Sequence, residues 1–174
     1  MQRIFRLDTW KVFILILLPL VIPDTEFGFG LQVAYLIFSL CWYYYLALEL
    51  FKLLPEDHEM YFSKFKFHFF FPLLYFTIAF IFTGGGYSLT LNGMNEYGPT
   101  GELMIPLHLF GMYCIFYCLY FIAKVMIMAK YQKCDAEIKE YIGYFFALWF
   151  IPIGIWFIQP ILQELFMEDE IQQS

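Results

Sequence analysis

An apolar stretch at residues 103–129, LMIPLHLFGMYCIFYCLYFIAKVMIMA, constrains the fold of this chain more than any other feature. Lys124 is its only formal charge and lies near its end. As an α-helix the stretch would be about 40 Å long, whereas the hydrocarbon core of a bilayer is about 30 Å thick. The stretch therefore predicts a membrane-spanning helix, with expected bounds of 103–127.

Composition and four further apolar segments extend this prediction to the whole chain. Of the 174 residues, 61% are hydrophobic and 15% are charged, against about 25% charged in an average soluble domain. We therefore predict an all-α fold, a polytopic membrane helix bundle that forms one integral-membrane domain over residues 1–174. The five expected transmembrane helices lie at residues 10–23, 31–54, 67–83, 103–127 and 141–162.

The first of these segments, 10–23, allows a second architecture because it is short and contains Pro19. A proline inside a helix removes a backbone hydrogen bond and kinks or breaks the helix. The second choice therefore has four transmembrane helices plus a re-entrant N-terminal segment. This alternative would move Arg3, Arg6 and Lys11 to the opposite side of the membrane from the other basic residues.

The distribution of charge predicts the orientation. All ten Lys and Arg residues lie in the N-terminal region, the 52–66 connection or the 124–139 connection. The regions 24–30, 84–102 and 164–174 contain none. Because basic residues favour the cytoplasmic side of a membrane, five crossings predict a cytoplasmic N-terminus and a periplasmic C-terminus.

Polar residues within apolar spans are candidates for function because burying them in lipid is unfavourable. We expect Glu49, His108 and Glu102 to form the intramembrane polar or ion site, if the protein has one. The alternative for Glu49 is a local pair with Lys52, about one helical turn away, and for His108 a structural role. The stretch 87–102 that leads into the fourth span is expected to be an outer loop, either a lid or an idle connector.

The sequence gives little support for metal, cofactor or enzyme chemistry. Met112 follows His108 by four residues and shares its helix face, which is a weak soft-metal pattern. No catalytic residues and no cofactor are predicted, because the GxSxG, HExxH and GxxxxGK[ST] patterns are absent. The sequence therefore favours a non-enzymatic protein.

The four cysteines, expected as free thiols, form no CxxC pair: Cys41, Cys114, Cys118 and Cys134.

The last predicted span carries a proline and a glycine near its middle. Pro152 is expected to kink the helix, and Gly154 to permit close packing of a neighbouring helix. Trp149 and Trp156 are seven residues apart, so in a continuous helix they would share one face.

This span also resembles a segment of known proteins. Residues 145–160, FFALWFIPIGIWFIQP, are similar to a segment of uncharacterised small multi-pass inner-membrane proteins of Bacteroidetes-type bacteria. In those proteins basic residues often follow the Gln-Pro pair, whereas Ile161, Leu162, Gln163 and Glu164 follow it here. The resemblance implies a bacterial inner-membrane location and supplies no functional residues.

Three functions remain open on the sequence alone. The first is a non-enzymatic membrane module that binds a partner protein or assembles with itself. The second is an oligomeric pore or membrane-perturbing accessory, for example of an antiviral defence system, a link that rests on size and class alone. The third is a small-solute transporter or intramembrane enzyme that uses Glu49, His108 and Glu102. The expected partners are the lipid bilayer and a protein or second copy of the chain, and no basic stripe indicates nucleic acid.

Overall fold

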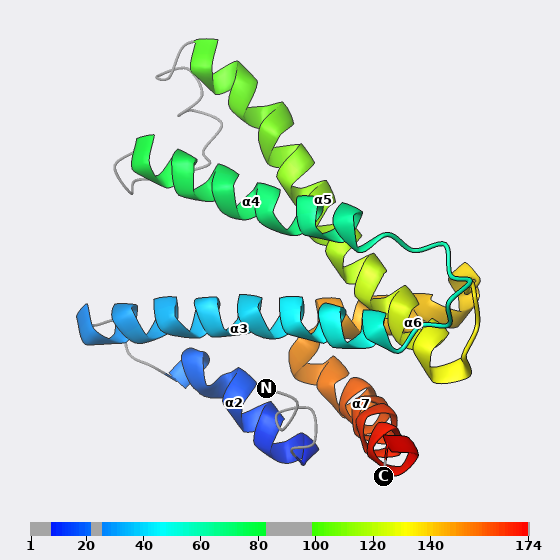
Figure 1. The fold of residues 1–174 in the computed structure, drawn as a ribbon. Coiled ribbons are helices and arrows are strands. Elements are labelled where there is room, and N and C mark those ends of the chain that lie inside the picture. The colour runs from blue at the N-terminus through cyan, green and yellow to red at the C-terminus, as the bar shows by residue number, and fades with distance from the viewer. Residues whose placement is uncertain (1–7, 22–25, 83–98, 174) are drawn as a thin grey trace. The chain divides into compact units, whose positions relative to one another are not determined.

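The computed structural model of the protein describes residues 8–21, 26–82 and 99–173 (Figure 1). Within these ranges the chain forms six α-helices and no β-strand. The all-α prediction is therefore confirmed for the described residues. The helices are α2 (Thr9–Val21), α3 (Glu26–Lys52), α4 (Phe62–Phe82), α5 (Pro99–Tyr131), α6 (Ile138–Trp149) and α7 (Ile151–Gln173).

The predicted spans and the observed helices agree for the first four segments and differ for the fifth. Helices α2 to α5 take up the first four spans in chain order. The fifth, 141–162, is divided between α6 and α7 by a break at Phe150. Helix α5 begins at Pro99 and so includes the last residues of the expected 87–102 loop, whose earlier residues lie outside the described ranges.

Two of the described helices contain a segment that is long and apolar enough to cross a membrane. These segments are Ala34–Lys52 in α3 and Ile105–Tyr131 in α5. Helix α7 contributes a shorter apolar segment, Ile151–Phe166. The helices are thus compatible with a membrane protein, but length and hydropathy do not by themselves yield five crossings.

The chain divides into two compact units. The first comprises Met1–Met60 and Phe121–Ser174, and the second comprises Tyr61–Tyr120. Helix α5 contributes its C-terminal part to the first unit and its N-terminal part to the second. Each unit is described separately below.

The core of the first unit surrounds the C-terminal part of α5. Almost every side chain there is buried, on all sides of the helix, which is the pattern of a central helix rather than of a surface helix with one apolar stripe. Within residues 121–129 Lys124 is the exception, with its side chain 15% exposed. The buried residues of this part are Phe121, Ile122, Ala123, Val125, Met126, Ile127, Met128 and Ala129. Helices α3, α6 and α7 supply further buried residues, namely Leu46, Ala47, Leu50, Leu148, Ile155, Ile158 and Leu162.

Aromatic side chains on α4 and on the N-terminal part of α5 pack against one another in the second unit. Phe71 packs edge-on against Phe110 with ring centroids 4.7 Å apart. Gly111 lies beside Tyr75, and a Cβ atom at this glycine would be 3.6 Å from the tyrosine ring, an ordinary contact distance. Aromatic pairs at such distances add to the stabilisation from area burial, so this unit is held together largely by rings.

The C-terminus of α5 is joined to that of α3 through Gln132. This residue has a φ of 48°, and the Lys133 amide donates to the Met128 carbonyl at 3.0 Å, as in a Schellman helix terminus. The Gln132 amide group donates to the Ala129 carbonyl at 2.8 Å and to the Leu53 carbonyl at 3.2 Å. One side chain thus binds carbonyl groups at the ends of both helices.

Candidate functional site

Glu49, the first polar residue singled out from the sequence, forms an ion pair within α3. Its Oε1 atom lies 2.6 Å from Lys52 Nζ. The Glu49 side chain is only 6% exposed, whereas the Lys52 side chain is 58% exposed. The Tyr45 hydroxyl is also hydrogen-bonded to this carboxylate. A buried carboxylate needs such partners because an unpaired charge in apolar surroundings is strongly unfavourable.

His108 lies in the aromatic core of the second unit. Its ring is 5.6 Å from the Phe76 ring and 6.4 Å from the Tyr75 ring, both in edge-on geometry. The Nδ1 atom is buried and has no hydrogen-bond partner. His108 and Glu49 belong to different compact units.

Met112 and Glu102, the other residues of the predicted ion or metal site, both belong to α5. Met112 is 40% exposed, and the side chain of Glu102 lies outside the described part of the chain. Among the described residues no group of three or more His, Cys, Asp or Glu side chains could hold a metal ion.

The break between α6 and α7 is the most distinctive feature of the first unit. Helix α6 ends at Trp149, Phe150 has φ −100° and ψ 55°, and α7 begins at Ile151. Pro152 has no amide hydrogen, so the Leu148 carbonyl cannot receive the usual bond from four residues further on. That carbonyl instead accepts a hydrogen bond of 3.2 Å from the Tyr43 hydroxyl of α3. The break is therefore stabilised by a side chain more than 100 residues away in sequence.

Gly154 makes the close approach of α6 and α7 possible. A Cβ atom at this position would lie 1.8 Å from the Ala147 carbonyl oxygen and 2.6 Å from the Ala147 Cα atom. No side chain fits there, because such distances are far below van der Waals contact.

Trp149 and Trp156 lie on different helices, so the seven-residue spacing does not place them on one face. Trp156 packs against Phe13 of α2 at 5.6 Å between ring centroids.

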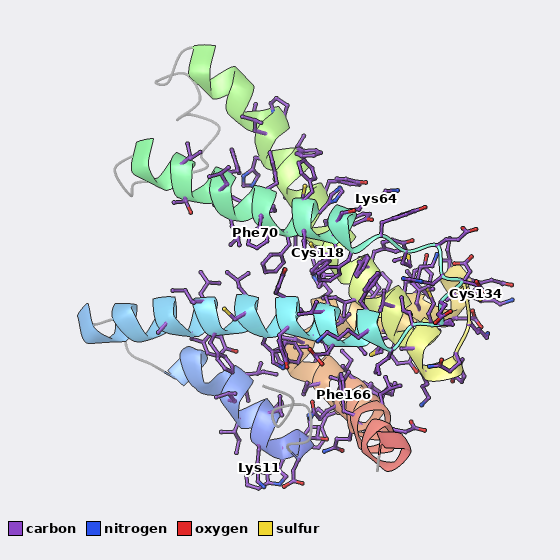
Figure 2. All side chains as sticks on the ribbon, viewed as in Figure 1. Lys11, Lys64, Phe70, Cys118, Cys134 and Phe166 are labelled. Atoms are coloured by element: carbon purple, nitrogen blue, oxygen red, sulfur yellow. The ribbon has the colours of Figure 1, made fainter. Side chains whose placement is uncertain are left out.

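Ion pairs connect both ends of the α6–α7 segment to the end of α5 and the link that follows it. Glu164 of α7 lies 2.7 Å from Lys130 Nζ, and Glu140 of α6 pairs with Lys133. Figure 2 shows Cys134 in the same link between α5 and α6, where its thiol is exposed. These ion pairs thus connect the end of α5 to α7 and the following link to α6.

Two carboxylates, Asp135 in this link and Glu140 in the first turn of α6, have altered proton affinity. The hydrogen bond from Lys124, 2.6 Å away, lowers the pKa of Asp135. The hydrogen bond from Lys133 likewise lowers the pKa of Glu140. A lowered folded-state pKa means that each pair contributes its stabilisation above the ordinary carboxyl pKa and loses it as the pH falls through the lowered value. Both pairs therefore persist at neutral pH.

A small apolar cavity of about 50 Å³ lies between α2, α3 and the start of α7. Its hydroxyl groups are all engaged with backbone carbonyls. Tyr35 donates to Ile16 at 3.2 Å, Ser39 donates to Tyr35 at 2.9 Å, and Tyr43 donates to Leu148 at 3.2 Å. The cavity therefore offers apolar surface rather than free donors, and suits a small apolar group.

Comparison with known proteins gives no relative for this arrangement: no family profile, no curated protein and no solved structure matches the chain. The resemblance of residues 145–160 to bacterial inner-membrane proteins accordingly stays a prediction.

Sequence reasoning missed the residues that organise the first unit. Nothing in a single sequence pairs Tyr43 with Leu148, which lies 105 residues further along the chain. In the second unit it also missed His68, whose Nδ1–H donates to the Lys64 carbonyl at 2.7 Å and whose ring stacks on Tyr117 at 3.9 Å. A usable signal did exist at Pro152, because within a helix the carbonyl four residues before a proline loses its usual amide donor.

We expect Tyr43→Phe to lower the free energy of unfolding by about 1–3 kcal/mol, because it leaves a buried carbonyl without a partner. Tyr35→Phe is the matched control, since the Ile16 carbonyl lies inside the regular helix α2 and can keep its intrahelical bond. Tyr35→Phe should lower the free energy of unfolding by about 1 kcal/mol or less. Unfolding in mixed detergent micelles, followed by circular dichroism, measures both values, and equal losses would contradict this role of Tyr43.

We expect Gly154→Ala to destabilise the protein by about 1–3 kcal/mol or more, because the added methyl group meets backbone atoms that cannot move aside independently. The matched control is Gly143→Ala on α6, where nothing lies within 4 Å of the new Cβ atom. This control should be neutral or stabilising by up to about 1 kcal/mol through helix propensity. The same unfolding assay compares them, and a neutral Gly154→Ala would rule out the tight α6–α7 contact.

Proposed function

We propose that the chain is a small integral-membrane protein with a non-enzymatic role, a helical module that binds a partner protein or assembles with itself. The observation that carries this proposal is an inverted distribution of polarity. Large apolar side chains are exposed, and the Ile153 side chain reaches 70% exposure. Glu49 and Gln159, by contrast, are buried.

The exposed apolar side chains occur on all six described helices. They include Leu36 and Ile37 on α3, Phe67, Phe70 and Leu74 on α4, Leu109 and Tyr113 on α5, and Ile153 and Phe157 on α7. Soluble monomers rarely expose apolar patches larger than a few hundred Å². Lipid tails, a partner helix or a second copy of the chain would cover such surfaces without cost.

The position of the charged residues in the first unit supports a membrane location. Lys52 is at the C-terminus of α3, Lys130 is at that of α5, and Glu140 is in the first turn of α6. Charges at helix ends can reach the polar boundary of a bilayer while the apolar parts remain in lipid. By the positive-inside rule the proposal places this basic end in the cytoplasm. The bacterial inner membrane is proposed on the resemblance of residues 145–160.

The polar groups of the first unit favour a packing and binding role over a conduit. A pore or transporter directs polar groups toward the permeating species. Here the Glu49 carboxylate is bound by Lys52, and the hydroxyls of Tyr35, Ser39 and Tyr43 donate to backbone carbonyls. These groups are committed to contacts within the protein.

We test the membrane location with two isoleucine substitutions of similar exposure. Ile37 is 57% exposed in the middle of α3, and Ile138 is 67% exposed at the start of α6 beside the charged link. In lipid, Ile37→Asp should disfavour insertion by about 2.5–3.5 kcal/mol, whereas Ile138→Asp should change stability by no more than about 0.5 kcal/mol. The measurement is the fraction of protein that remains in the membrane pellet after carbonate washing.

The outcomes separate the module from a soluble protein and from a pore. Three results together would support the module. The native chain stays in the membrane pellet, Ile37→Asp lowers the fraction of protein in the pellet, and the detergent-solubilised protein is an oligomer or carries a stoichiometric partner. A native chain that stays soluble and monomeric without detergent, with Ile37→Asp more soluble still, would contradict it. Leakage of dye from liposomes that contain the purified protein would favour the pore instead.

A further inference from the structure

Two glutamates, one on each side of the break between α6 and α7, form ion pairs with lysines that lie close together in the chain. Glu140 near the start of α6 pairs with Lys133, and Glu164 of α7 pairs with Lys130. A straight helix from Glu140 to Glu164 would be about 36 Å long. Paired side chains cannot span that distance from partners three residues apart, so the segment turns back on itself.

The turn divides the segment into two arms, α6 with 12 residues and the part of α7 that precedes Glu164. Phe150 is the non-helical residue, and the contact of Gly154 with the Ala147 backbone shows how closely the arms approach at the tip. The 12 residues of α6 are about 18 Å long as a helix. This is well short of the hydrocarbon core of about 30 Å, so α6 alone cannot reach the far side of a membrane.

The tip of this hairpin is suited to apolar surroundings. Phe150 and Ile153 are exposed large apolar side chains. Irregular backbone is tolerated at membrane depth only where its polar groups find partners. Two carbonyls at the tip have such partners: the Phe150 carbonyl accepts bonds from the Ile153 and Gly154 amides at 3.0 and 2.8 Å, and the Leu148 carbonyl accepts one from Tyr43.

The open end of the hairpin coincides with the basic end of the first unit. The link that pairs with Glu140 and Glu164 follows directly on α5, and Gln132 in this link is bound to the Leu53 carbonyl after α3. The C-terminal part of α7 therefore emerges beside the ends of α3 and α5. In Figure 1 the segment α6–α7 runs from the yellow link through orange to the red C-terminus.

We propose that α6 and α7 form a re-entrant helical hairpin, which enters and leaves the membrane on the basic face and places the C-terminus on the same side as Cys134. The proposal rests on the membrane location proposed above. It replaces the periplasmic C-terminus that follows from counting 141–162 as a complete crossing. The re-entrant segment is thus at the C-terminal end of the chain, rather than at the N-terminal end as in the second architecture considered from the sequence.

Labelling of single cysteines in the full-length chain tests this arrangement. The reference chain keeps Cys134 and carries Cys41→Ser, Cys114→Ser and Cys118→Ser. The test chain carries these three changes together with Cys134→Ser and Ser174→Cys. Each is expressed in a bacterial host and treated with a membrane-impermeant maleimide, before and after permeabilisation of the cells.

The hairpin predicts the same pattern for both chains, with labelling low in intact cells and increased by the same factor on permeabilisation. Labelling of Ser174→Cys in intact cells while Cys134 remains protected would overturn it. If the cysteine changes impair folding, a reporter domain fused after Ser174 of the native sequence gives a second readout. The hairpin predicts that the reporter is active in the cytosol. Activity only in the periplasm would overturn the hairpin.

Carbonate washing of the same samples distinguishes failure of the hairpin from failure of the proposed membrane location. Chains in the membrane pellet with Cys134 and residue 174 on opposite sides would refute the hairpin alone. Chains recovered in the soluble fraction would refute the membrane location, and with it the hairpin.

Discussion

The architecture of the first unit depends on the backbone carbonyl of Leu148, which has no donor within its own helix. Pro152 removes the amide that would normally reach it. In apolar surroundings an unpaired carbonyl is unfavourable by an amount comparable to the net stabilisation of several hydrogen bonds. The Tyr43 hydroxyl supplies the missing bond from α3. The helix break and the packing of α3 beside it are therefore two consequences of one requirement.

Around this break, the unit satisfies polar groups by contacts between elements that are distant in sequence. Gln132 donates to carbonyls at the ends of α3 and α5, and Lys130 reaches Glu164 of α7. Residues 121–129 of α5, just before these contacts, are buried on all sides of the helix apart from Lys124. Polar groups are thus paired at one end and in the interior, while large apolar side chains are exposed, which supports the membrane location proposed above.

The sequence predicted the helices well because apolar runs and their interruptions are local features. It also identified Pro152 and Gly154 as special positions, and the pairing of Glu49 with Lys52 follows from a spacing of three residues. The fold-back of α6 and α7 could not be predicted in this way. It depends on contacts such as Lys130–Glu164 and Tyr43–Leu148, whose members are 34 and 105 residues apart, and no pattern in one sequence pairs them. The environment of His108 among aromatic rings is hidden for the same reason.

The central claim, that residues 140–164 turn back at Phe150, is tested most directly by zero-length carbodiimide cross-linking of the native chain in membranes. The reagent joins an amine to a carboxylate only when the two are in contact. Peptide mass spectrometry should find an amide between Lys130 and Glu164, absent from Glu164→Gln, beside one between Lys133 and Glu140. Recovery of the Lys133–Glu140 product without any Lys130–Glu164 product would show that the far end of the segment lies elsewhere, and would contradict this account.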